Sequence, residues 1–131
     1  MKENILKPLR TFGRSKGKPL STNQELLMQK EYPKLDISKS VEFVKNPLAN
    51  IEGEVWLEIG FGGAEHILKK AKNNPDITII GVEPFLNGIV KAVKGVVDQG
   101  LKNILLYRGD ARQIINLLPD SSINRVFILF P

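Results

Sequence analysis

The sequence predicts an α/β fold in which helices cover the faces of a parallel β-sheet. In the second half of the chain, short apolar runs rich in β-branched residues alternate with segments whose apolar residues recur every three or four positions. Parallel strands are buried on both faces and therefore read as apolar runs, whereas the longer period is that of an amphipathic helix. Alternation of the two is typical of a parallel sheet.

Four runs of the sequence are expected to form strands. Each is short, apolar and bounded by glycine, proline or polar residues, which favours a buried strand. The runs are 55–59, 77–82, 104–107 and 126–130. We interpret Trp56 and Phe127 as core side chains, while Phe130 either joins the core or lines a site at the end of the fourth strand.

Three helices are expected between these strands. The clearest pattern covers 85–97, where apolar residues recur every three or four positions and Gly100 follows as a helix stop. Weaker patterns predict helices over 64–73 and 111–118, each followed by a proline. His66 lies in the first of these and is interpreted as a surface or packing residue, with a catalytic base as the alternative.

The first fifty residues lack this regular pattern. Residues 1–20 contain prolines and glycines without a sustained periodicity, which is typical of a mobile arm. Ser21 begins a stretch that predicts a capped helix over 23–31, and Pro33 ends it. Residues 33–53 are expected to be a connector.

The positive charge of the chain is concentrated near its N-terminus. The net charge is +5, and residues 1–18 account for it with six Lys or Arg against one Glu. A basic arm favours a polyanionic partner such as nucleic acid, although a solvated tail that aids solubility would carry the same charges. We therefore divide the chain into a basic arm and connector, 1–50, and one domain, 51–131.

Composition excludes several kinds of site. The chain has no cysteine, which excludes disulfides, thiolate metal sites and cysteine nucleophiles, and it has a single histidine, which excludes a multi-histidine metal site. We expect no metal. Its apolar runs are too short to cross a bilayer and no signal peptide opens it, so we expect a cytoplasmic protein with no membrane contact.

The residues that follow the predicted strands carry the candidate chemistry. A glycine-rich loop, 58–64, begins with Glu58, and two further acids, Glu83 and Asp110, follow the second and third strands. In open parallel sheets, ligands bind outside the carboxyl ends of the strands. The sequence thus predicts that three carboxylates and a glycine loop meet at one edge of the sheet.

The glycine spacing favours one cofactor class. The dinucleotide pattern G-x-G-x-x-G would need glycine at 65, where Glu65 would repel a pyrophosphate at a helix N-terminus. This spacing disfavours a nucleotide-dependent oxidoreductase. An acid followed by G-x-G-x-G instead accommodates S-adenosylmethionine, which carries a sulfonium and an ammonium but no phosphate. Here Ala64 stands in the third glycine position, and Gly60 and Gly62 would let the backbone approach the ligand.

Each acid has a task that suits this cofactor. Glu83 follows Gly60 at about the spacing of an acid that accepts both ribose hydroxyls. Glu58 would bind or orient the methionine ammonium, and Asp110 would accept the adenine amine. The alternative for each acid is a helix N-cap or a solvated turn carboxylate.

Several stretches are distinctive beyond the glycine loop. They are 10–14, 16–20, 56–62, 81–88, 109–112, 118–120 and 125–131. Together they resemble the bacterial tRNA (guanine-N7)-methyltransferases over essentially the whole chain. The glycine loop alone indicates only a methyltransferase, whereas Glu-Pro-Phe-Leu-Asn-Gly at 83–88 and the Leu-Phe-Pro ending are much more specific.

The resemblance implies a Rossmann-like class I methyltransferase fold and a function in tRNA modification. This family transfers a methyl group from S-adenosylmethionine to guanine N7 in the tRNA variable loop. Glu58, Glu83 and Asp110 match its cofactor-binding acids. Ala64 departs from the usual glycine and is expected to be tolerated because alanine adds only one methyl group.

The resemblance also gives the basic arm a partner. Arg10, Arg14, Lys16 and Lys18 match the family's N-terminal extension and are expected to contact the tRNA backbone.

The sequence departs from the family at its end. The family's proposed catalytic aspartate would follow directly after Pro131, so no residue of this chain is a catalytic candidate. We therefore expect an N-terminal portion of such an enzyme, with about four strands and the fourth at an unpaired edge. The alternative is a non-catalytic tRNA-binding remnant.

Overall fold

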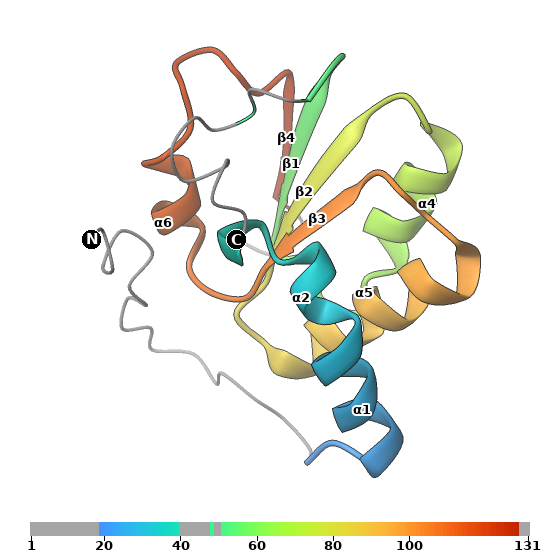
Figure 1. Ribbon diagram of the computed structural model, residues 1–131. Coiled ribbons are helices and arrows are strands. Elements are labelled where there is room, and N and C mark those ends of the chain that lie inside the picture. The colour runs from blue at the N-terminus through green and yellow to red at the C-terminus, as the bar shows by residue number, and fades with distance from the viewer. Residues whose placement is uncertain (1–18, 40–47, 49–50, 129–131) are drawn as a thin grey trace.

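The computed structural model describes residues 19–39, 48 and 51–128 (Figure 1). Their four strands form one parallel sheet in the order β3-β2-β1-β4, so the expected fold class is confirmed. The strands are β1 (Val55–Ile59), β2 (Thr78–Val82), β3 (Ile104–Tyr107) and β4 (Arg125–Ile128). The chain winds outward from β1 to β3 and then returns to the other side of β1, which creates a switch in strand order between β1 and β4.

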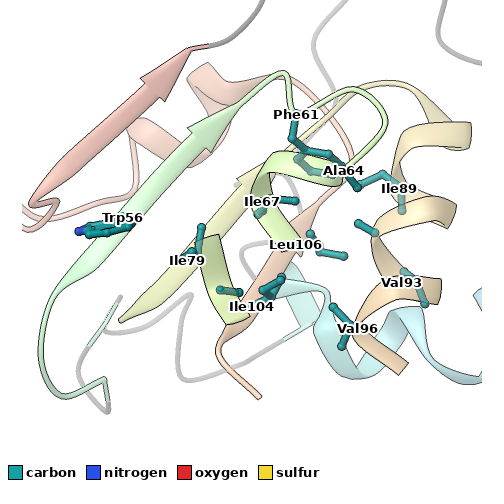
Figure 2. Packing of buried hydrophobic residues seen from close by; sticks show 12 residues of the cluster. Trp56, Phe61, Ala64, Ile67, Ile79, Ile89, Val93, Val96, Ile104 and Leu106 are labelled. Carbon is teal, nitrogen blue, oxygen red and sulfur yellow. The ribbon is translucent and has the colours of Figure 1, made fainter. Parts of the chain in front are cut away.

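Helices cover both faces of this sheet. One face is covered by α4 (Glu65–Asn73) and α5 (Leu86–Gln99) and the other by α6 (Ala111–Ile115). Figure 2 shows Ile67 of α4 and Ile89 and Val93 of α5 directed toward the strands, and all three side chains are fully buried. Burial of each such side chain contributes about 1.5–3 kcal/mol, so these helices are fixed mainly by their apolar faces.

The ends of two helices follow from local chemistry. Gly100 caps α5 with φ +63°, in the left-handed region that favours glycine, as the sequence predicted. The helix expected over 111–118 ends early, at Ile115. The amides of Leu117 and Leu118 donate to carbonyls three residues back, a tighter pattern than the α-helix, so the segment closes as a turn.

Part of the N-terminal region packs against the sheet. The capped helix that the sequence predicts is α1 (Thr22–Lys30), where Ser21 and Gln24 form a reciprocal capping box. Next come α2 (Tyr32–Leu35) and the short η1 (Ile37–Lys39). Ile37 is buried and Asp36 forms a bridge to Leu106 of β3. These residues cover the outer edge of β3 although they fall in the expected connector. The domain boundary near residue 50 stays a prediction.

The fourth strand is less buried than its sequence suggests. Among the described strands β4 pairs only with β1, which fits the expected edge position. Val126 and Ile128 are 53% and 57% exposed, so the expectation of a buried strand is wrong for the described part of this run. Phe127 is half-buried against Trp56, at 5.5 Å between ring centroids, and Trp56 is a core residue as expected. Phe130 lies outside the described residues. No helix in the described part of the chain is long and apolar enough to cross a membrane.

Candidate functional site

A cleft of about 540 Å³ opens at the carboxyl ends of β1, β2 and β3. The volume is within the range of small-molecule sites. Four of the predicted residues, Gly60, Gly62, Glu83 and Asp110, line it together, whereas Glu58 does not. The expected meeting of strand ends is thus found for the glycine loop and two of the three acids.

The glycine loop turns through left-handed backbone conformations. Gly60 and Gly62 have φ of +70° and +59°, which glycine adopts at no steric cost. Ala64 has φ +74° and is fully buried, so this alanine is held in a conformation that costs an L-residue roughly 1–2 kcal/mol. Alanine in place of glycine at this position therefore costs free energy because of its backbone conformation rather than because of its added volume.

Glu83 ties the loop after β1 to the turn after β2. Its Oε1 accepts the Gly62 amide at 2.8 Å and its Oε2 accepts the Phe85 amide at 3.0 Å. The residue is only 6% exposed. A carboxylate offers about four acceptor positions, so both oxygens keep capacity for a ligand's hydroxyl groups.

Gly88, in the first turn of α5, lets that helix lie against the loop. A Cβ at this position would collide with the Gly62 carbonyl oxygen and would lie 3.0 Å from Glu83 Cγ. Gly88 is not among the site residues predicted from the sequence. Its signal was a glycine inside a strong helical pattern, which often marks close packing.

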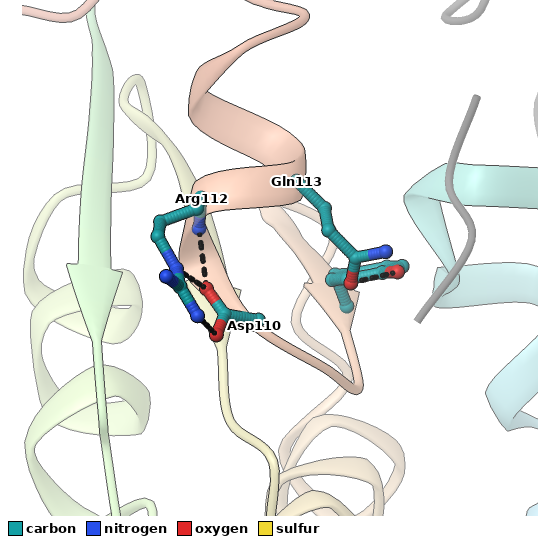
Figure 3. A network of polar contacts seen from close by, with 4 residues as sticks. Asp110, Arg112 and Gln113 are labelled. Carbon is teal, nitrogen blue, oxygen red and sulfur yellow. Dashed lines mark hydrogen bonds and ion pairs between the residues drawn. The ribbon is translucent and has the colours of Figure 1, made fainter. Parts of the chain in front are cut away.

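Asp110 caps α6 and lines the cleft at the same time (Figure 3). Its Oδ1 accepts the Arg112 amide and Nε, both at 2.9 Å, and its Oδ2 accepts a terminal guanidinium nitrogen at 2.7 Å. These hydrogen bonds, opposed by partial burial, lower the pKa of the Asp110 carboxyl. The N-cap alternative is therefore realised, and the predicted adenine contact stays a prediction.

A buried polar pair, Tyr107 and Gln113, packs against the segment that leads from β3 to Asp110. The Tyr107 hydroxyl donates to Gln113 Oε1 at 2.9 Å, and Figure 3 marks this hydrogen bond at Gln113. A Cβ at Gly109 would press on both side chains. Burial raises the pKa of Tyr107, which keeps the hydroxyl protonated as a donor. The pair fixes the path of the chain between β3 and Asp110.

Glu58 occupies a different environment. Its side chain is fully buried, and its Oε1 accepts a hydrogen bond from Lys70 Nζ at 3.1 Å. Its Oε2 has no hydrogen-bond partner among the described residues. Lys70 Nζ also lies 4.3 Å from the centre of the Phe127 ring. Sequence reasoning missed Lys70, although it stands one helical turn from buried Ile67, on the apolar stripe of α4.

His66, the absence of a metal site and the basic arm were also predicted from the sequence. His66 is exposed on α4, as expected, and its Nδ1 lies 3.1 Å from Lys70 Nζ. Within the described ranges, no group of three or more His, Asp or Glu side chains could hold a metal ion. The predicted tRNA contacts Arg10, Arg14, Lys16 and Lys18 lie outside the described residues.

Curated relatives match almost the whole chain. A tRNA (guanine-N(7)-)-methyltransferase of Caulobacter sp. (strain K31) is 45% identical over 95% of this chain and 54% of its own length. One from Hyphomonas neptunium is 46% identical over 94% of this chain and 57% of its own length. The chain therefore spans about half the length of these relatives.

A solved structure and a family model also match the chain. A structure titled "Structure of an antibiotic related Methyltransferase" superposes with a TM-score of 0.52 at 28% identity, covering 74% of this chain and 52% of that one. Residues 52–131 match the Methyltransf_4 family, described as "Putative methyltransferase". This match includes every strand of the sheet and every residue that lines the cleft. The chain belongs to the Methyltransf_4 family.

Proposed function

We propose that this chain binds S-adenosylmethionine and forms part of a tRNA (guanine-N7)-methyltransferase, which produces 7-methylguanine in the tRNA variable loop. One observation carries the proposal: relatives with that name match about 95% of the chain, and the family match over residues 52–131 includes the whole acid-lined cleft. Because tRNA is its substrate, we place the protein in the cytoplasm.

The cleft suits this cofactor chemically. Glu83 keeps acceptor positions for the two ribose hydroxyls, and Asp110 lines the same cleft and would accept a hydrogen bond from the adenine amine. Glu58 does not line the cleft, but it directly precedes Ile59 and Gly60, which do, and its buried Oε2 is the oxygen that we assign to the methionine ammonium. Glu65 begins α4 beside the loop, where a carboxylate disfavours phosphates but is compatible with a cationic ligand.

The reaction is an in-line displacement. S-adenosylmethionine supplies an electrophilic methyl group on a sulfonium. The lone pair of guanine N7 would form the new bond to this methyl group as the carbon–sulfur bond breaks, so N7 would take the positive charge and no proton would be transferred. The residues of this chain have the task of fixing the methyl donor in line with N7 and keeping water away. We assign no catalytic residue within the chain.

The basic arm provides the second half of the proposal. Arg10, Arg14, Lys16 and Lys18 would contact the phosphates of tRNA, so binding should weaken as salt rises. Because the chain spans about half of its relatives' length, a second candidate function is tRNA binding without methyl transfer.

Transfer of a labelled methyl group to tRNA distinguishes the two candidates. It should be measured for this chain and for one extended past Pro131 with the corresponding half of a relative. Incorporation at N7 by the extended chain supports the methyltransferase. If both chains bind tRNA, neither incorporates label and neither binds S-adenosylmethionine, the binding-only function is correct.

A further inference from the structure

We propose that Lys70 is a positioning residue for the ligand's ammonium group: it holds one oxygen of Glu58 so that the other oxygen remains free to accept that ammonium. The inference rests on the proposed function, since it concerns how the same cofactor is recognised. It adds a residue on α4 that does not line the cleft.

The first observation is the unequal use of the two Glu58 oxygens. Oε1 is bound by Lys70 at 3.1 Å, while Oε2 is buried with no partner among the described residues. A buried carboxylate needs both a compensating charge and satisfied oxygens. Lys70 meets the first requirement and half of the second, which leaves one strong acceptor for a cationic donor.

The second observation is how firmly Lys70 is held. Its side chain is 18% exposed, and Nζ contacts Glu58, the Phe127 ring and His66. The contacts join β1, β4 and α4, so Lys70 has little freedom to leave Glu58. A lysine held in this way orients the carboxylate rather than competing as a mobile cation.

The third observation is the place of Glu58 in the chain. It directly precedes Ile59 and Gly60, which line the cleft, and the loop that follows leads straight into α4. Glu58 and Lys70 thus flank the glycine loop from its two ends. Movement of the Glu58 carboxylate would therefore shift the glycine loop where it contacts the ligand.

The test compares two ligands on three variants. S-adenosylhomocysteine carries the ammonium, and its deaminated analogue keeps the carboxylate and lacks only the ammonium. The dissociation constant of the analogue divided by that of S-adenosylhomocysteine, both measured by calorimetry, isolates recognition of the ammonium. We expect Lys70→Met to reduce the ratio about tenfold, as for loss of one well-oriented charge-assisted hydrogen bond. Lys70→Arg should retain most of the ratio. Lys69→Met, the same charge change at the exposed neighbour on α4, should leave it unchanged.

A purely structural ion pair predicts otherwise. In that case Lys70→Met weakens both ligands equally, and an unchanged or increased ratio overturns the inference while leaving the proposed function intact. If neither ligand binds the unmodified, folded chain, both fail. Should Lys70→Met not fold, the ¹³C signal of the Glu58 carboxyl in the unmodified chain decides. A larger shift with S-adenosylhomocysteine than with the analogue supports the inference, and equal shifts refute it.

Discussion

Replacement of Gly88 by alanine separates the structure's account of α5 from a simple helix-propensity argument. Propensity alone predicts that Gly88→Ala stabilises the helix by about 0.8–1.0 kcal/mol. The structure predicts the reverse, because the new Cβ would collide with the Gly62 carbonyl oxygen and approach Glu83 Cγ to 3.0 Å. The first contact is with backbone, which cannot rotate away, so either the first turn of α5 or the glycine loop must move.

The expected change in the free energy of unfolding is the difference between the cost of overpacking and the gain in helix propensity. Overpacking of this kind costs typically 1–3 kcal/mol, and subtraction of the propensity gain leaves a net loss of roughly 0–2 kcal/mol. The loop movement also displaces Gly62 from Glu83, so affinity for S-adenosylmethionine should fall about tenfold or more, as expected when a charge-assisted hydrogen bond is lost.

Urea unfolding and calorimetric titration measure the two effects. Gly63→Ala is the matched control, because a Cβ there would meet nothing within 4 Å. It should change neither stability nor affinity by much. The reasoning is refuted if Gly88→Ala is more stable than the parent and binds the ligand equally well.

Two further predictions concern the cleft's loops. Arg112→Ala should raise the pKa of Asp110 toward its ordinary value, which NMR titration of the carboxyl can follow. Because the pKa of Asp110 is lowered in the folded chain, its carboxylate adds stability at pH values above the unfolded pKa. That stability is lost as the pH falls through the folded pKa, so the variant should lose less stability on acidification than the parent. An unchanged Asp110 pKa contradicts this. Ala64→Gly should change the free energy of unfolding by less than about 1 kcal/mol, since relief of left-handed strain offsets the lost methyl group and the added chain entropy. A loss well above that value in urea unfolding would show that Ala64 is not strained.

From residue 54 onward, the sequence was sufficient to predict how strands and helices alternate along the chain, because each apolar period was local. Ile79 and Ile80 point to opposite faces of β2 and both are buried, which is the signature of a strand covered on two sides. The burial of β4 could not be predicted in the same way. Its residues are as apolar as those of β2, but exposure depends on what lies beside and above the strand, which the run itself does not encode.

The site was predicted in part for the same reason. Glu83 and Asp110 follow strands directly, so chain order alone brought them to one edge. The partners of Glu58 were not accessible to this reasoning. Lys70 reaches Glu58 from a different element, and only the packing of α4 on β1 shows that the acid is paired within the protein. Likewise, the clash that makes Gly88 necessary involves a carbonyl on another loop.

Binding of S-adenosylmethionine to the folded chain, measured by isothermal titration calorimetry, tests the central claim most directly. The account predicts saturable binding at one site. Glu83→Ala, which removes the carboxylate that holds the Gly62 and Phe85 amides, should weaken it by at least tenfold. Glu52→Ala removes an exposed acid outside the cleft and should leave the affinity unchanged. Absence of binding by the folded parent chain, or equal affinity in Glu83→Ala and Glu52→Ala, would contradict the assignment of the cleft.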